Sequence, residues 1–145
     1  MKVINYRSLE TIVLPGSKTT NDNYEWKNTE GLYFIGLMAI DPNENHYYLV
    51  KVGQSKQIGK RIQQYFTHCP IIYQNNTFYS TEGHNSFYRD YCEINCHNFL
   101  SQYAYGIANG ADEWFLVSKA SYFLLCKLFN DTVMFDMIAN GEAGY

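Results

Sequence analysis

A nearly continuous apolar run covers Gly31 to Ile40 (GLYFIGLMAI). It is short and is followed by the turn-forming cluster Asp41–Asn45, so it predicts a buried strand that ends in a tight turn. A second aromatic and β-branched run, His46 to Gly53 (HYYLVKVG), follows at once. Two such runs joined by a short turn predict a β-hairpin.

A helix is expected directly after this hairpin. Ser55 offers a hydroxyl at the N-cap, and Pro70 closes the segment. Between Lys56 and Phe66, apolar residues recur at helical spacing. These apolar positions are Ile58, Ile62, Tyr65 and Phe66.

The remaining pattern predicts further short strands and two longer helical regions. Strands are expected at Thr11–Leu14, Ile71–Tyr73, Thr77–Tyr79 (after a turn at Asn75–Asn76) and Glu113–Val117. Helices are expected at Ser86–Tyr105, with Phe87, Tyr91, Ile94 and Asn98 on one side, and at Ala120–Phe129, capped by Ser118 and continued by Val133–Ala139.

This order of elements predicts an α/β fold, an α+β sandwich with a small, mainly antiparallel central sheet and flanking helices. The 145 residues fit one domain, with an N-terminal lead-in at 1–29 and a C-terminal helical extension at 119–145. Hydrophobic residues make up 46% of the chain, which is enough for a core. No apolar run is long enough for a membrane span, and the first residues do not form a signal peptide, so we expect a soluble cytoplasmic protein.

The charges are distributed unevenly. The net charge is −3, but no Asp or Glu occurs between Asn45 and Thr81. That stretch carries four of the 11 basic residues, while the rest of the chain holds all 14 acids. The four are Lys51, Lys56, Lys60 and Arg61, with His46 and His68 nearby. A local basic stretch on an acidic protein is typical of a phosphate-facing surface, although a solvated helix face gives the same pattern.

The four cysteines contain no C-x-x-C pair. In a reducing compartment we expect them to be free thiols used as small apolar side chains. Cys92, Cys96 and His97 share one stretch, which leaves a zinc site open as an alternative, but zinc needs four ligands in a recognisable spacing.

Several of these segments together resemble the GIY-YIG nucleases. Gly31-Leu32-Tyr33 resembles the first element of that family, and Lys51-Val52-Gly53 resembles the second, with Lys51 where the family has tyrosine. The helix that follows carries Arg61 and Tyr65 four positions apart, as in that family. Asp112-Glu113-Trp114-Phe115 resembles the E-W-F end of a phage-type branch. The resemblance covers about residues 30–118.

The resemblance implies a metal-dependent endonuclease that hydrolyses phosphodiester bonds in DNA. Glu93, on the long helix, would be the ligand of Mg²⁺ or Mn²⁺, and Arg61 would bind phosphate oxygens. Tyr33 or Lys51 would act as the base. The implied catalytic set is Tyr33, Lys51, Arg61, Tyr65 and Glu93. The implied nucleic-acid-binding set is Lys56, Lys60, His68 and His97, although His97 as a metal ligand or as a packed side chain is also open.

Two other functions remain open. In the first, the domain would be a catalytically inactive module that binds DNA. In the second, it would be a phage or host-defence domain that uses the same scaffold for protein interactions. A homodimer or a protein partner is equally open, and a phage-encoded protein would work in the host cytoplasm. Taken singly, Tyr33, Arg61, Glu93 and Trp114 have ordinary structural interpretations as core or surface residues.

Overall fold

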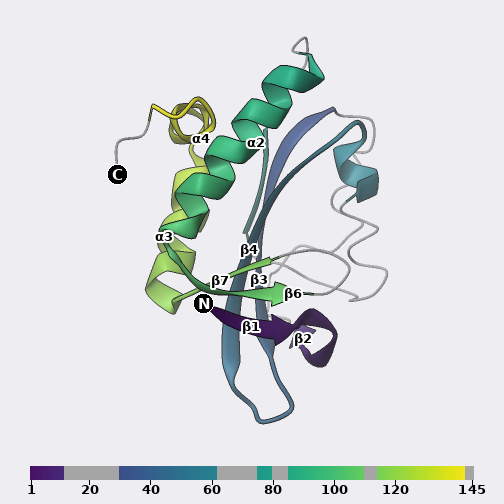
Figure 1. Cartoon of the computed structure of the whole chain (residues 1–145), viewed down its shortest axis with the longest axis vertical. Coiled ribbons are helices and arrows are strands. Elements are labelled where there is room, and N and C mark those ends of the chain that lie inside the picture. Colours follow the sequence, from purple (N-terminus) through teal and green to yellow (C-terminus); the bar gives the residue numbers. More distant parts are fainter. Residues whose placement is uncertain (12–29, 62–74, 80–84, 110–113, 143–145) are drawn as a thin grey trace.

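The computed structural model describes residues 1–11, 30–61, 75–79, 85–109 and 114–142. These residues form a mixed β-sheet with helices packed against it (Figure 1), which confirms the predicted α+β class. In the described part, the sheet has seven strands, more than the small sheet that was expected. No described helix has the length and apolarity to cross a membrane.

The centre of the sheet is the predicted hairpin. Strand β3 (Gly31–Ile40) pairs antiparallel with β4 (His46–Ser55) through ten residue pairs. In the turn, a carboxylate oxygen of Asp41 accepts hydrogen bonds from the backbone N–H groups of Asn43 and Asn45, each at 2.9 Å. The predicted turn at Asp41–Asn45 is therefore confirmed, and its side-chain hydrogen bonds fix the register of the hairpin.

The sheet order is β1–β6–β7–β4–β3–β2, and β5 pairs with β3. Besides the hairpin, the strands are β1 (Lys2–Asn5), β2 (Glu10–Thr11), β5 (Asn75–Tyr79), β6 (Ala104–Asn109) and β7 (Trp114–Val117). The pairing of β1 with β6 is parallel and the other pairings are antiparallel. The expectation of a mainly antiparallel sheet is confirmed.

Two strands lie in segments for which the sequence predicted something else. β1 falls in the supposed lead-in, and β6 overlaps the end of the supposed helix Ser86–Tyr105. The two strands pair with each other and lie very close, since a Cβ atom on Gly106 of β6 would collide with the backbone carbonyl oxygen of Lys2 in β1. Asn75 and Asn76 belong to β5 and not to a turn, because they pair with Gly36 and Ile35 of β3. These strands follow from long-range pairing, which local propensity does not encode.

The helices begin at side-chain caps. In α2 (Ser86–Ser101), Asn85 accepts a hydrogen bond from the N–H of Tyr88 at 2.9 Å. Ser118 caps α3 (Lys119–Asn130) as predicted. The expected continuation is instead a separate helix, α4 (Thr132–Ala139), because Asp131 ends α3 in an extended conformation and caps α4.

The helix expected after the hairpin is described only at its start, where residues 58–61 are helical. Ser55 does not cap its first turn; its hydroxyl accepts from the N–H of Gln57, which precedes the helix. Several predictions lie outside the described residues. They are the predicted strand Thr11–Leu14 from residue 12 on and the start of the predicted strand Glu113–Val117. They also include everything predicted in residues 62–74, namely Tyr65, His68, Pro70 and the strand Ile71–Tyr73.

The sheet separates two apolar cores. Helices α2, α3 and α4 lie together on one side of the sheet (Figure 1). They bury the side chains of Phe34, Val50 and Val52 with those of the helices. On the other face, Tyr33, Ile35, Leu49, Trp114 and Leu116 form a second core, joined by Ile58. The alternation along β3 and β4 therefore decides which residues can reach a site on either face.

The large apolar residues Phe87, Tyr91 and Ile94 of α2 do not face the core. Phe87, Tyr91 and Ile94 do share one side, but that side is exposed to solvent. The buried side carries Cys92, Cys96, Phe99 and Leu100.

Small thiols allow α2 to pack closely on the other helices and the sheet. Cys92, Cys96 and Cys126 are all buried free thiols in the core under α2 and α3. Burial raises the pKa of Cys92 and raises the pKa of Cys96 to about 12. A zinc site needs thiolates, so this apolar setting does not fit the zinc alternative.

The buried thiol of Cys96 is expected to make the folded protein less stable at alkaline pH. An unfolded cysteine loses its proton near pH 9, whereas the folded protein keeps this proton up to about pH 12. The folded state therefore binds more protons in this window, and its stability decreases as the pH rises. We predict that urea unfolding shows a loss of about 1.4 kcal/mol from this group between about pH 8 and pH 10.

The matched variant is Cys96→Ala, measured at the same two pH values. It should be less stable than the parent at about pH 8 because of the lost packing, and its stability should decrease less at alkaline pH. An equal decrease in both proteins would contradict the assignment to Cys96.

Candidate nucleic-acid site at the edge of strand β4

Tyr33 and Lys51 lie on the same face of the sheet. Tyr33 pairs with Gly53, and Lys51 pairs with Ile35 two residues further along β3. The two side chains are therefore diagonal neighbours on adjacent strands. Tyr33 is only 1% exposed and belongs to the core opposite α2. Lys51 is half-buried, and its Nζ lies 5.8 Å from the ring centre of Trp114.

Gly53 provides the space that the Tyr33 ring occupies. A Cβ atom at Gly53 would lie 2.7 Å from Cζ of Tyr33 and would also collide with its hydroxyl. The ring thus crosses the strand directly over the glycine backbone. Glycine at this position has a packing reason that is independent of any catalytic role.

Strand β4 changes its neighbour near this point. In the described residues, β7 pairs only with Tyr48, Leu49 and Val50 of β4. Just beyond, His97 of α2 reaches the strand, with its Nε2 2.8 Å from the carbonyl oxygen of Val52. A carbonyl only accepts, so Nε2 carries the proton. In the neutral ring, the lone pair is therefore on Nδ1.

Glu93 stands one helical turn before His97 on α2. Its Oε1 lies 4.0 Å from His97 Nε2, and the two side chains are 26% and 40% exposed. The pair is therefore accessible to solvent at the edge of β4. A partly exposed carboxylate beside an imidazole can bind a cation, accept a proton or orient a water molecule.

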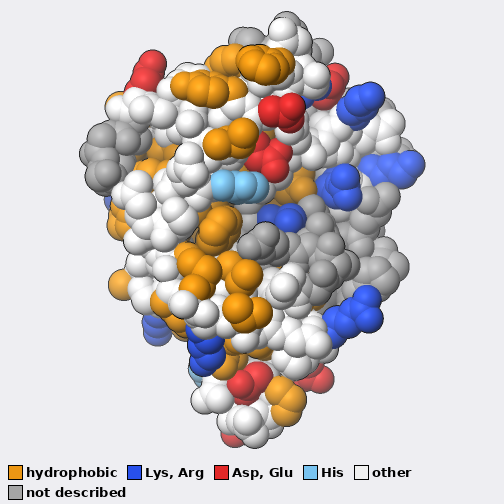
Figure 2. Space-filling model, in the orientation of Figure 1, with side chains coloured by type: hydrophobic (Ala, Val, Ile, Leu, Met, Phe, Trp, Pro, Cys, Tyr) orange, Lys and Arg blue, Asp and Glu red, His pale blue; other side chains and the backbone are white. Residues whose placement is uncertain are grey.

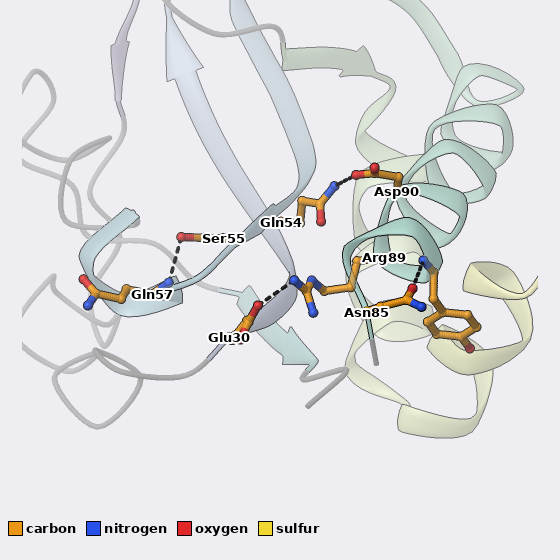
Figure 3. Close-up of polar contacts among 8 residues, drawn as sticks. Glu30, Gln54, Ser55, Gln57, Asn85, Arg89 and Asp90 are labelled. Carbon is orange, nitrogen blue, oxygen red and sulfur yellow. Dashed lines mark hydrogen bonds and ion pairs between the residues drawn. The ribbon is translucent and has the colours of Figure 1, made fainter. Parts of the chain in front are cut away.

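The start of α2 is tied to the open end of the hairpin by two polar contacts (Figure 3). Arg89 forms an ion pair with Glu30 at 2.5 Å, and the Gln54 amide donates to Asp90. Arg89 is buried at 8% exposure, although it is charged. These contacts set the position of α2, and hence of Glu93, relative to β4. The sequence did not identify them, because their partners lie far apart in the chain.

The basic residues after β4 remain at the surface. Lys56, Lys60 and Arg61 are exposed, and the Arg61 backbone N–H donates to the carbonyl oxygen of Gln57 at 3.0 Å. Tyr65 and His68, which belong to the predicted set, lie outside the described residues. Figure 2 shows acidic side chains beside a histidine on the face over α2, with basic side chains close by.

The structure brings the predicted residues together in two groups. Tyr33 and Lys51 leave one face of the sheet, whereas Glu93 and His97 come from α2, which covers the other face. The two groups are connected through the backbone of β4, since Lys51 directly precedes Val52, the partner of His97, while their side chains lie on opposite faces of the sheet. We refer to Lys51, Val52, Glu93 and His97 as the β4-edge site.

The donor set at the β4-edge site fits some metals and not others. In the described part of the chain, no three His, Cys, Asp or Glu side chains are grouped to hold an ion. Glu93 has one carboxylate, which is sufficient for Mg²⁺ because this ion keeps most of its waters. A zinc or other fully protein-ligated centre does not fit.

An α+β domain with exposed cations beside a carboxylate–imidazole pair is suited to phosphate ligands. The chain matches the T5orf172 domain over residues 32–128, more than half of its length, and it belongs to that family. This family is nuclease-like and DNA-binding, which is compatible with a role on DNA. No curated protein and no solved structure matches the chain.

The family match corrects the assignment to the GIY-YIG nucleases, which was wrong. The short motifs behind that assignment have structural explanations in this fold. Gly53 is needed for the packing of Tyr33, and Trp114 is a core residue stacked on Tyr6 at 5.8 Å. Such three-residue segments reflect strand packing as readily as shared descent.

The contact between Tyr33 and Gly53 gives a direct test of this part of the structure. We predict that Gly53→Ala lowers the free energy of unfolding by about 2 kcal/mol in urea, because the new methyl group overpacks the Tyr33 ring. In a Tyr33→Leu background, the same change should cost little, since the smaller side chain leaves room. Equal losses in both backgrounds would show that the ring does not lie over Gly53.

Proposed function

We propose that this T5orf172 domain is a metal-dependent endonuclease that hydrolyses a phosphodiester bond in DNA at the β4-edge site. The observation that carries the proposal is the pair Glu93 and His97, held at β4 by the hydrogen bond of His97 to Val52, the residue that follows Lys51. The family match supports action on DNA.

Hydrolysis of a phosphodiester needs a deprotonated water, a stabilised phosphorane and a neutralised leaving oxygen. A bound Mg²⁺ would supply charge stabilisation for the last two needs. Glu93 would hold the ion by its half-buried carboxylate, and Mn²⁺ would bind in the same way. Arg89 and Asp90, anchored to the hairpin, keep this part of α2 in place.

In this proposal, the basic side chains on β4 and just after it bind the phosphate groups of the DNA backbone. Lys51 contacts the phosphate at the edge of the strand, and its charge is compatible with the nearby Trp114 ring. Arg61 offers planar, permanently charged donors for phosphate oxygens. Lys56 and Lys60 are exposed and add contacts along the strand of DNA.

His97 is the residue placed to take a proton from water. Its Nε2 is engaged by Val52, so the Nδ1 lone pair of the neutral ring is the basic atom. Tyr33 is a weaker candidate for this role, because it is buried in the core on the opposite face. In the proposal Tyr33 positions Gly53 and the end of β4, and Lys51 contacts the substrate.

The burial of Tyr33 also favours a second function. A domain that binds DNA without cutting it needs the cations of the β4-edge region but no aligned base. Tyr33 lies across the sheet from Glu93, which is compatible with this second function. The two functions differ in their product: the endonuclease cuts DNA and needs the metal and Glu93 to do so, whereas the binding module leaves the DNA intact.

A plasmid-nicking assay with Mg²⁺ or Mn²⁺ tests the proposal. The parent protein should nick the plasmid, and Glu93→Gln should reduce the rate by at least about 100-fold, because the amide binds a divalent ion poorly. The matched control is Glu142→Gln, which removes an exposed acid near the C-terminal end of the described chain.

Binding of a DNA duplex by the Glu93→Gln protein separates the two functions. In the endonuclease, this variant still binds DNA, and its affinity decreases with salt because phosphate contacts remain. Salt-sensitive binding by a parent protein that nicks nothing with either metal would favour the non-cutting module. Nicking that is unaffected by Glu93→Gln would contradict the role of this carboxylate.

A further inference from the structure

One row of side chains crosses the sheet on the side of α2. Val50 pairs with Phe115, Phe115 with Ile107, and Ile107 with Val3. Partners at the same register share one face of the sheet, so this row runs from β4 through β7 and β6 to β1. All four side chains are apolar.

The helices cover only the first part of this row. Val50 is fully buried, Phe115 and Ile107 are half-buried, and Val3 is 62% exposed. The side chains of Phe115, Ile107 and Val3 thus form a partly open apolar surface, which we call the apolar shelf. Figure 2 shows hydrophobic side chains gathered over β1, β6 and β7 on this face, beside a histidine.

The apolar shelf begins at the β4-edge site. The His97 ring lies 5.8 Å from the Phe115 ring, at an angle of 59°. The same histidine bonds Val52 and neighbours Glu93. A ligand whose phosphate lies at His97 therefore has its adjacent groups next to Phe115.

The far side of the shelf is polar. Asn5 and Asn109 pair with each other two residues beyond Val3 and Ile107, and both are exposed. By the alternation of strands, their amides lie on the same face as the apolar shelf. The Asn5 side-chain oxygen accepts a hydrogen bond from the backbone N–H of Arg7, so Asn5 would donate through its NH₂ group, while the Asn109 amide can donate to and accept from the edges of bases.

We propose that the apolar shelf binds unpaired bases of a DNA strand whose backbone lies at the β4-edge site. This inference rests on the proposed function and specifies its substrate as single-stranded or locally unpaired DNA. Bases in a duplex are stacked on each other and cannot lie on an apolar surface, whereas unpaired bases stack on aromatic and apolar side chains. The contact between Phe115 of the shelf and His97 of the β4-edge site favours DNA over an apolar protein segment.

Fluorescence anisotropy without divalent metal, so that no strand is cut, tests this substrate. The probes are a labelled single strand of about 12 nucleotides, the same strand with abasic residues at its central positions, and the matching duplex. The parent protein should bind the intact single strand about tenfold more tightly than the abasic strand, which carries the same phosphates.

Two variants connect this difference to the shelf. Phe115→Leu, which keeps an apolar side chain, and Val3→Ser, at an exposed position, should weaken binding of the intact strand and leave the abasic strand unaffected. The matched control is Val133→Ser on α4, which is 67% exposed and lies away from the shelf. It should change neither affinity.

The outcomes separate this inference from the proposed function. Equal affinity of the parent for the intact, abasic and duplex probes would overturn the inference, while salt-sensitive binding would leave the DNA function in place. Shelf variants that bind every probe like the parent would also overturn it and would favour a protein segment on the shelf. A parent that binds no probe would refute both.

Discussion

The pairing of β3 with β4 is the constraint on which the rest of the structure depends. Its ten residue pairs assign every side chain of Gly31–Ile40 and His46–Ser55 to one of two faces. One face forms the core with Tyr33 and Trp114, and the other packs against α2, α3 and α4. A shift of one residue would exchange the two sets and expose both cores, so the register is strongly determined.

The end of this hairpin is also where different elements meet. Among the described residues, Val50 is the last residue of β4 that pairs with β7, and α2 reaches the strand just beyond it through His97. The ion pair of Arg89 with Glu30 fixes the start of the same helix. A carboxylate and an imidazole are thereby held at β4, where Lys51 leaves the opposite face of the same strand. The apolar shelf continues from this edge across the part of the sheet that the described helices do not cover, and in our proposal it gives unpaired bases contacts separate from those of the phosphates.

The sequence predicted the elements whose signals are local. The hairpin, its turn at Asp41 and the Ser118 cap are encoded by neighbouring residues, and the structure confirms them. β1 and β6 were not predicted, because their pairing depends on Gly106 and on residues far apart in the chain.

For the candidate site, the sequence suggested residue types but not their arrangement. It did not indicate that the sheet separates Tyr33 from Glu93. It also gave no sign of the contact between His97 and Val52, since a backbone carbonyl carries no sequence signal.

The central proposal is that Glu93 binds a divalent ion beside His97 at the edge of β4, and amide NMR spectra with substoichiometric Mn²⁺ test it most directly. The account predicts that the signals of Lys51–Gly53 and Glu93–His97 broaden first, and that Glu93→Gln abolishes this broadening. Asp41 and Glu44, in the hairpin turn, provide an internal comparison with other carboxylates. Broadening centred on that turn, or unchanged in Glu93→Gln, would contradict the account.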